Sequence, residues 1–404
     1  MDTIKVGVIG LGCRSISNME RMLMIPDVEI IAVCDIYEDR CNEASELVMK
    51  NGKKAPFKTT DYKEVINHND VDVVTVFSSW ETHIQIGIEA MKCGKIVGLE
   101  VGGALSLDEC WELVDAYEET KSPIMFLENC CYGKNEMLVR NMVRDGIFGE
   151  IVHCHGAYAH DLRKEVSCGK ENRHYRLKHY LNRNCENYPT HELGPIAKIL
   201  DINRGNRMVS LVSVASKSAG IERYIEDRKD TFENKELIGK KFKQGDIVNT
   251  IITCENGETI SLRLDTSLPR SYSREFTVRG TKGMYEEITN SVFIDGDEEL
   301  FDTAEYSRKV LDNAKEYEEK YLPDYWKNIT KEQLEGHGGM DYFLFTAFFD
   351  AVRENKPMPI DVYDAAAWMS ITALSEYSIA NGNIPVEVPD FTRGEWKTRE
   401  RLDV

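Results

Sequence analysis

The sequence lacks several features that would place it in particular protein classes. It has no apolar run long enough to cross a bilayer as a helix, and its first residues enter an apolar β-branched segment, so we expect neither a membrane protein nor a signal peptide. It also lacks an excess of basic residues, because 50 Lys and Arg stand against 69 Asp and Glu, a net charge of −19. Such a surface repels phosphate backbones, so we expect no nucleic-acid partner.

The 11 cysteines lack the spacing of disulfide frameworks and zinc sites, since no C-x-x-C pair occurs. The adjacent Cys130 and Cys131 are expected to be small buried residues at a strand end. In a strand, His153 and His155 would share one face while Cys154 points to the other. We therefore expect no metal site and, because so many thiols are unpatterned, a reducing compartment such as the cytoplasm.

The first 128 residues alternate between short apolar segments and amphipathic segments of helical length. Strand, helix and short link follow one another in the order typical of a doubly wound parallel sheet. We therefore predict a Rossmann domain over residues 1–128, as the N-terminal part of an α/β plus α+β chain. Its expected strands are Ile4–Ile9, Val28–Val33, Val71–Phe77, Ile96–Leu99 and Ile124–Leu127.

Residues 129–404 show strands that alternate in polarity without regular helices between them, which predicts an open, mostly antiparallel sheet. A hairpin turn is expected at residues 280–283, an exposed aperiodic insertion at 221–246 and surface helices within 297–335. Two closing helices are expected to pack back on the first domain. The expected elements are strands Ile151–Ala159, Met208–Ala215, Ile247–Cys254, Thr259–Thr266 and Glu275–Arg279, and closing helices Met340–Asn355 and Tyr363–Asn381.

The junction of the first strand and first helix predicts a dinucleotide site. Gly10 and Gly12 stand in G-L-G-C-R-S, where glycines let the backbone approach a pyrophosphate and the helix N-terminus supplies free N–H groups. Asp35 follows the second strand, where a carboxylate accepts hydrogen bonds from ribose hydroxyls and repels a 2′-phosphate. The sequence therefore predicts NAD rather than NADP as the cofactor.

Several longer sequence motifs along the chain resemble those of one enzyme family. The chain is similar to the Gfo/Idh/MocA oxidoreductases, although their usual E-K-P reads E-V-G here, with Val101 in place of lysine. The similarity narrows to the NAD-dependent α-N-acetylgalactosaminidases of glycoside hydrolase family 109. The words that carry it include W-E-T-H from Trp80, E-N-C-C-Y-G from Glu128, A-Y-A-H-D-L-R from Ala157, R-L-K-H from Arg176, N-Y-P-T-H-E-L-G-P from Asn187, P-R-S-Y-S-R from Pro269 and G-H-G-G-M-D from Gly336.

The resemblance implies two groups of site residues. Beside the two glycines, the residues that would contact NAD are Cys13, Arg14, Asp35, Trp80, His83, Glu100, Val101, Asn129 and Tyr188. The residues that would line the sugar site are Tyr158, Arg176, Tyr188, Pro189, Thr190, His191 and Tyr272. The chain departs from the family at Ser15 and Glu192, where glycines are expected, and at Gly102-Gly103, which replaces a segment containing proline.

The family's reaction implies glycoside cleavage without a pair of flanking carboxylates. Sugar carbon 3 gives a hydride to NAD, a base removes the carbon 2 proton, the aglycone leaves carbon 1, water adds, and the hydride returns. Tyrosine and histidine suit the proton transfers once neighbours tune their pKa values. His191 is the candidate for the carbon 3 proton, and either Tyr132 or Tyr188 for carbon 2. Tyr272 would assist the leaving group, and Arg176 would bind sugar hydroxyls.

Two other interpretations use the same residues. A net sugar oxidoreductase, or an enzyme that eliminates from a 3-keto glycoside, would share every cofactor contact, and the missing lysine at Val101 argues only against the dehydrogenase. A sensor of NAD or sugar would have no need of Tyr188, His191, Arg176 and Tyr272 together. By analogy with the family, we also expect a homo-oligomer.

Overall fold

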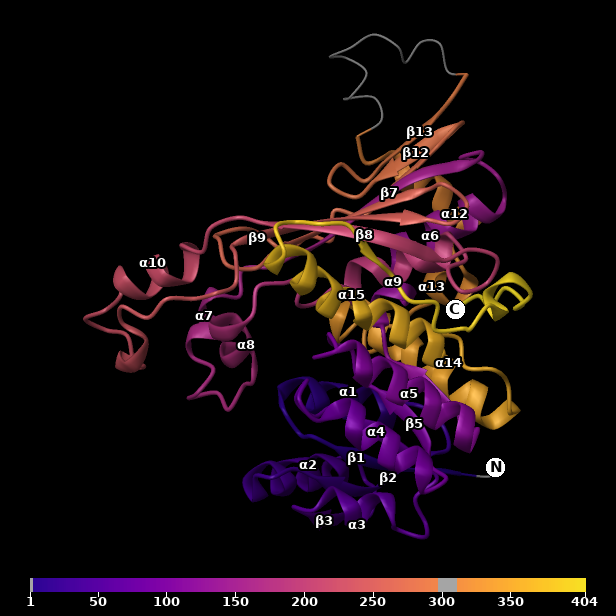
Figure 1. Ribbon diagram of the computed structural model, residues 1–404. Helices are drawn as coiled ribbons and strands as arrows, with labels where there is room; N and C mark the ends of the chain where they lie inside the picture. The colour runs from indigo at the N-terminus through magenta and orange to yellow at the C-terminus, as the bar shows by residue number, and fades with distance from the viewer. Residues whose placement is uncertain (1–2, 297–310) are drawn as a thin grey trace. The chain divides into compact units, whose positions relative to one another are not determined.

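The computed structural model describes residues 3–296 and 311–404, and the chain divides into two compact units. The first unit comprises Met1–Gly133, Asn328–Ala366 and Leu402–Val404. The second comprises Lys134–Lys327 and Ala367–Arg401. Within the described residues each unit contains one β-sheet, and in Figure 1 the strands of the first unit are indigo to purple.

The first unit contains a six-stranded sheet in the order β3-β2-β1-β4-β5-β6, and every pair of neighbours is parallel. All four residues of β4 are buried, as expected of a strand covered on both faces. The chain order reverses between β1 and β4, and ligands of such sheets bind beyond the carboxyl ends of the strands at this point. The strands are β1 Ile4–Ile9, β2 Val28–Cys34, β3 Phe57–Thr59, β4 Val73–Val76, β5 Ile96–Leu99 and β6 Ile124–Phe126.

Helices of the first unit pack against this sheet. Gly98 of β5 allows a close approach, since a Cβ there would lie 3.1 Å from the Phe348 ring of α14. Asn355 ends α14 in the left-handed conformation with φ 50°, a common helix stop. The helices are α1 Cys13–Leu23, α2 Glu38–Lys50, α3 Tyr62–Ile66, α4 His83–Lys92, α5 Leu107–Thr120, η1 Asn129–Tyr132, η5 His337–Gly339 and α14 Met340–Glu354.

The second unit contains an eight-stranded sheet in the order β13-β12-β11-β7-β10-β9-β8-β14. Among the described strand pairs of this sheet only β7–β10 is parallel, so the prediction of a mostly antiparallel sheet is confirmed. The predicted hairpin turn also forms, because β11 and β12 pair across Thr281 and Lys282. The strands are β7 Ile151–Ala159, β8 Met208–Ala215, β9 Ile247–Cys254, β10 Thr259–Asp265, β11 Thr277–Gly280, β12 Gly283–Glu286, β13 Ser291–Ile294 and β14 Val386–Glu387.

One face of this second sheet is buried against helix α9. Gly156 of β7 makes room for α9, since a Cβ at Gly156 would lie 2.8 Å from Cβ of Glu192. Cys154 is buried on that side, whereas His153 and His155 are half-buried on the other, as predicted. The helices of this unit are α6 Lys134–Arg144, α7 Arg163–Ser167, α8 Arg176–Asn182, α9 Thr190–Ile199, α10 Gly220–Glu226, η2 Lys235–Leu237, η4 Asn313–Tyr317, α12 Glu318–Tyr321, α13 Asp324–Lys327 and η6 Glu395–Lys397, together with α15 Val362–Ala380 from Ala367 onward.

Two expectations about the surface need correction or restriction. The segment 221–246 is not simply exposed and aperiodic, because it contains helical turns and buries Ile221, Ile225 and Phe242. Of the surface helices expected within 297–335, residues 297–310 lie outside the described residues. The described helices include none that is both long enough and apolar enough to cross a membrane.

Candidate functional site

The loop between β1 and α1 leaves open space where a cofactor phosphate is expected. Gly10 has φ +86°, and a Cβ there would lie 2.6 Å from the backbone of Phe77 and Ser78. A Cβ on Gly12 would meet nothing within 4 Å, so the N-terminus of α1 stands open beside it. Ser15, which replaces the third glycine of the fingerprint, is fully buried in α1. The first two glycines therefore form a cradle that fits a pyrophosphate.

Asp35 lies directly after β2, and backbone groups hold its carboxylate in place. Oδ2 accepts the N–H of Leu11 at 2.7 Å and Oδ1 accepts the N–H of Tyr37 at 3.0 Å. Arg40 Nη1 is 3.6 Å from Oδ2. Each carboxylate oxygen has a second lone pair, so Asp35 can still accept hydrogen bonds from ribose hydroxyls.

Trp80, His83 and Gly102 pack together at the carboxyl ends of β4 and β5. A Cβ on Gly102 would lie 2.5 Å from the Trp80 ring and 2.8 Å from Cε1 of His83, so glycine in place of the family's usual residue lets these rings sit against the backbone. His83 is fully buried, and neither ring nitrogen has a hydrogen-bond partner within residues 3–296 and 311–404. Burial lowers the pKa of His83 to about 4, so the ring is neutral and can bond to a ligand.

A partly buried ionic network joins several of the predicted cofactor residues in the first unit. Asp341 accepts hydrogen bonds from Arg14 Nη1 and Nη2 at 2.5 and 2.8 Å and from Asn129 Nδ2 at 2.8 Å. Arg14 Nε also lies 3.9 Å from the Glu100 carboxylate. Burial raises the pKa of Glu100 to about 7, and the charges of Asp341 and Glu128 act in the same direction against Arg14. Asp341 was not among the residues predicted for this site.

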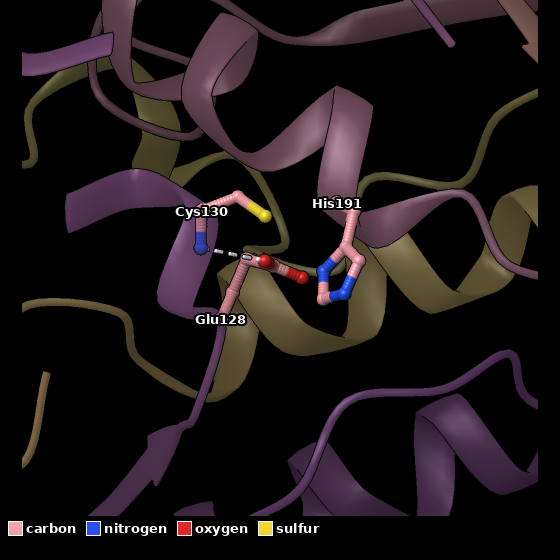
Figure 2. A group of neighbouring side chains, drawn as sticks. All are labelled: Glu128, Cys130 and His191. Atoms are coloured by element: carbon pink, nitrogen blue, oxygen red, sulfur yellow. Dashed lines mark hydrogen bonds between the residues drawn. The ribbon is translucent and has the colours of Figure 1, made fainter. Parts of the chain in front are cut away.

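Glu128 follows β6 and organises the short helix η1. Its carboxylate accepts the backbone N–H of Cys130 at 3.0 Å, as Figure 2 shows. Cys130 and Cys131 are buried as predicted, although they lie in η1 and not at a strand end. Val101 and Tyr132 are also buried in this unit, and a valine at position 101 has no group that can transfer a proton.

In the second unit, the structure brings together four of the predicted sugar-site residues. Tyr188 and His191 lie at the start of α9 with ring centroids 4.8 Å apart, and Tyr158 of β7 lies 4.7 Å from Tyr188 and 5.6 Å from His191. Arg176 lies over the Tyr188 ring at 4.9 Å. Its Nη1 donates to the Tyr158 hydroxyl at 3.5 Å. The four side chains form one aromatic and cationic cluster, which we call the Tyr-His cluster.

Pro189 and Thr190 connect this cluster to helix α9. Pro189 is the residue that precedes the helix, and Thr190 is its first residue and is fully buried. Because Pro fixes φ and Thr190 is packed, the backbone at the start of α9 holds Tyr188 and His191 on the same side.

Tyr272 is 47% exposed and reaches the cluster through His160. Its ring lies 5.2 Å from His160, whose Nδ1 is 3.5 Å from the Tyr158 hydroxyl. Arg274 Nη1 lies 3.3 Å from the Tyr272 hydroxyl, and Arg274 Nε donates to Glu136 at 2.8 Å. Arg270 instead pairs with Asp265 at 2.5 Å, so of the two arginines that flank Tyr272 only Arg274 bonds to it.

Sequence reasoning missed His160, Glu165 and Asp341. His160 belongs to the quoted word A-Y-A-H-D-L-R and Asp341 to G-H-G-G-M-D, but neither word indicated a role. Burial lowers the pKa of His160, so its ring is neutral and can accept or donate a proton at neutral pH. Glu165 lies 3.4 Å from Arg176 Nε and fixes the direction of that guanidinium.

Two family profiles match the chain. One, described as "Oxidoreductase family, NAD-binding Rossmann fold", matches residues 4–127, and the other, "Glycosyl hydrolase 109, C-terminal domain", matches residues 132–398. A glycosyl hydrolase family 109 protein of Solibacter usitatus is 38% identical over 98% of this chain and 90% of its own length. An α-N-acetylgalactosaminidase of Tannerella forsythia is 36% identical over 98% of this chain and 88% of its own.

Solved structures with a similar fold share much less sequence. An oxidoreductase from Agrobacterium radiobacter in complex with NAD+, L-tartaric acid and magnesium gives a TM-score of 0.69 at 14% identity, over 95% of this chain and 98% of that one. A levoglucosan dehydrogenase in complex with NADH and levoglucosan gives 0.69 at 17% identity, over 96% and 100%. At these identities the likeness concerns the fold alone.

Proposed function

The chain belongs to glycosyl hydrolase family 109, an NAD-dependent family of glycosidases, and on this premise we propose that it cleaves α-N-acetylgalactosaminides. The observation that carries the proposal is the Tyr-His cluster, which places two phenols, an imidazole and a guanidinium together in the second unit. The name of the Tannerella forsythia relative supports the choice of sugar. The open cradle at Gly12 and the unpartnered His83 support the cofactor.

We propose NAD rather than NADP as that cofactor. Asp35 is held at the end of β2 with free lone pairs toward a ribose, and its charge would repel a 2′-phosphate. Ile36, which is 77% exposed beside it, offers an apolar surface for the adenine. Bound NAD would supply an acceptor for the hydride of sugar carbon 3 and later return that hydride to the same carbon.

His191 is proposed to take the proton of the carbon 3 hydroxyl as its carbon loses the hydride. The resulting ketone acidifies the carbon 2 proton, and Tyr188 is the proposed base because it touches both His191 and Arg176. Arg176 would stabilise the negative charge of the enolate. Tyr132 of the first unit remains the alternative base, and phenylalanine variants of the two tyrosines separate them.

Tyr272 is proposed to give a proton to the leaving group as the bond at carbon 1 breaks. Arg274 supports this role because its guanidinium lies at the Tyr272 hydroxyl, where a positive charge favours loss of the phenolic proton. Water would then add to carbon 1, carbon 2 would regain a proton, and carbon 3 would regain its hydride and its hydroxyl proton before the sugar leaves as the hydrolysis product.

The test is to incubate the NAD-loaded protein with p-nitrophenyl α- and β-glycosides, including the α-N-acetylgalactosaminide, in D₂O. The expected result is nitrophenol release from that substrate, deuterium at carbon 2 of the sugar, and no net NADH. Accumulation of NADH with a free sugar would instead establish a net oxidoreductase. Release of an unsaturated 3-keto sugar would establish the eliminating enzyme.

We also propose a cytoplasmic location. All 11 cysteines lie within the described residues as free thiols, and so many thiols are typical of a reducing compartment. Fractionation of source cells should recover the activity with cytoplasmic markers, and recovery with periplasmic or secreted markers would contradict the proposal.

Association of copies of this chain is a further proposal. Val214 of β8 and Ile251 of β9 are 49% and 41% exposed, on the sheet face opposite the buried Val248 and Ile252. Pairing of copies would remove such apolar side chains from water. Sedimentation equilibrium should show a dimer or higher species, and a monomer at all concentrations would contradict it.

A further inference from the structure

Asp341 lies at the second residue of α14, and its fully buried carboxylate is surrounded by donors of the first unit. Arg14 donates two hydrogen bonds to it and Asn129 donates one. His337 Nδ1 lies 2.9 Å from Oδ2 of the carboxylate and 2.7 Å from Arg14 Nη1. Burial opposes ionisation of Asp341, but the charge of Arg14 and the hydrogen bonds from His337 and Arg14 outweigh it and lower its pKa. The group is therefore a carboxylate that only accepts.

The local sequence explains how this carboxylate reaches α1. Gly336, His337, Gly338 and Gly339 all have positive φ, at 71°, 45°, 65° and 97°. Three of these four residues are glycines, which adopt positive φ at little cost in free energy, whereas other residues rarely do so. The turn ends at the first residue of α14, whose N-terminal dipole favours an anion. A Cβ at Gly336 would lie 3.3 Å from Asp341 Oδ2, so the turn also passes directly beside the carboxylate.

The contacts of Asp341 decide which atoms its two partners offer to a ligand. Because a carboxylate accepts only, the Asn129 amide must turn its NH₂ toward Asp341, which leaves Oδ1 as the acceptor on the other side of the amide, 3.8 Å from Sγ of Cys130. Asp341 accepts a hydrogen bond from each terminal nitrogen of Arg14, which fixes the plane of the guanidinium group. In this orientation Nε of Arg14 lies 3.9 Å from the Glu100 carboxylate. Arg14, Asn129 and Glu100 all belong to the residues that the family resemblance assigns to NAD.

We propose that Asp341 is a positioning residue of the cofactor site, which fixes Arg14 and Asn129 in the arrangement that binds the pyrophosphate and nicotinamide half of NAD. The inference rests on the NAD binding of the proposed function. It does not depend on the identity of the sugar, since every group involved lies in the first unit. Asp341 itself need not touch the cofactor.

The test is the dissociation constant of NAD for the protein freed of cofactor, measured by isothermal titration calorimetry. The isosteric variant Asp341→Asn keeps one acceptor oxygen but places an NH₂ group where the other was and removes the negative charge, so Arg14 loses one of its two hydrogen bonds and its ion pair. The expected result is a loss of NAD affinity of about tenfold or more. The control is Asp350→Asn on the same helix, which removes an exposed pair with Arg353 and should leave NAD affinity unchanged.

Two further measurements separate positioning from general damage to the fold. Binding of AMP, which relies on Asp35, should be unchanged in Asp341→Asn. In a double-mutant cycle, Asp341→Asn in an Arg14→Met background should cost little beyond Arg14→Met alone, because the two residues act through one contact. Should Asp341→Asn lack a native thermal transition, the cycle of Arg14→Met with Asn129→Ala replaces it, and non-additive losses are again expected.

Several outcomes would overturn the inference. NAD affinity that is unchanged or tighter in Asp341→Asn would mean that Arg14 binds the cofactor without this anchor. Parallel losses of AMP and NAD, or fully additive losses in the cycle, would give Asp341 only a structural role. Failure of the wild-type protein to bind NAD at all would instead refute the cofactor in the proposed function, so the two failures are distinguishable.

Discussion

In the first unit, charged hydrogen bonds join Arg14, Asn129 and Asp341, whereas in the second unit Tyr158, Tyr188 and His191 meet ring against ring. The ionic network surrounds the buried Asp341 carboxylate and holds its members at hydrogen-bond distances of 2.5–2.8 Å. In the Tyr-His cluster, Arg176 Nη1 lies 3.5 Å from the Tyr158 hydroxyl, a longer distance than those of the hydrogen bonds that Asp341 accepts from Arg14 and Asn129.

This difference matches two different chemical tasks. A cofactor that stays bound through a reaction cycle needs fixed donors and acceptors, which a fully bonded network provides. Groups that take up and release protons need hydroxyl and ring nitrogen atoms that can turn to a substrate. A substitution in the ionic network of the first unit should therefore weaken cofactor binding, whereas a substitution in the Tyr-His cluster of the second unit should slow the reaction.

The largest expected effect is on the chemistry alone. His191→Ala should lower turnover of the α-N-acetylgalactosaminide by about 10²–10⁴-fold, because it removes the proposed acceptor of the carbon 3 proton. NAD affinity, measured by calorimetry, should stay unchanged. His153→Ala, on the outer face of β7, is the matched control and should keep normal turnover. Normal turnover in His191→Ala would remove this residue from the mechanism.

Replacement of Glu100, which lies in the first unit, should change how the free energy of unfolding depends on pH. Burial raises the pKa of Glu100 to about 7, so the folded protein binds this proton more tightly than the unfolded chain. The free energy of unfolding should therefore fall as pH rises from about 4.5 to about 7, by at most about 3 kcal/mol from this group. Glu100→Gln removes the titration, so the stability of the variant relative to wild type should increase over that range.

Thermal unfolding of the NAD-free proteins at several pH values measures this difference. Turnover per NAD-bound molecule at a single pH serves as the companion readout, since the Tyr-His cluster is unchanged. Parallel stability curves for the two proteins between pH 4.5 and 7 would show that Glu100 is ionised throughout in the folded protein.

Much of the fold was predictable from the pattern of apolar residues along the sequence. The strands β7, β8 and β9 begin and end where the alternation of side chains begins and ends, and β1 and β5 also have their predicted bounds. The family and its NAD-binding Rossmann domain are confirmed by the two matching profiles. Short strands such as β3 and β14 were not predicted, because two or three residues carry no period and their pairing depends on a neighbour.

The residues that contact and orient the predicted site residues were harder to predict than the site residues themselves. Tyr158, Arg176, Tyr188 and His191 do gather in one cluster, but their roles stay predictions. Asp341 lies 327 residues from Arg14 in sequence, and no local pattern shows that a helix start will return to the first glycine loop. His160 was missed because an isolated histidine after a strand has the same local pattern as a surface residue.

A smaller effect is expected from filling the close contact at Gly102. In Gly102→Ala, the new Cβ would fall 2.5 Å from the Trp80 ring and 2.8 Å from His83, so both rings must shift. The expected cost is about 1–3 kcal/mol of stability, with weaker NAD binding as a consequence. Chemical denaturation measures the first and calorimetry the second. Unchanged stability would mean that Trp80 and His83 can move without cost.

The smallest effect on stability, and the sharpest contrast with Gly102, is expected at Gly12. Its backbone at φ −72° suits alanine, and a Cβ there meets nothing within 4 Å, so Gly12→Ala should fold with wild-type stability. The same methyl group would occupy the space that the pyrophosphate needs, so NAD affinity should fall by about tenfold. The exposed thiol of the adjacent Cys13 gives a second readout, because NAD should protect it from alkylation in the wild-type protein and less so in the variant. If Gly12→Ala kept both the affinity and the protection, the pyrophosphate would have to lie away from Gly12, and the glycine loop would not be the phosphate cradle of this unit.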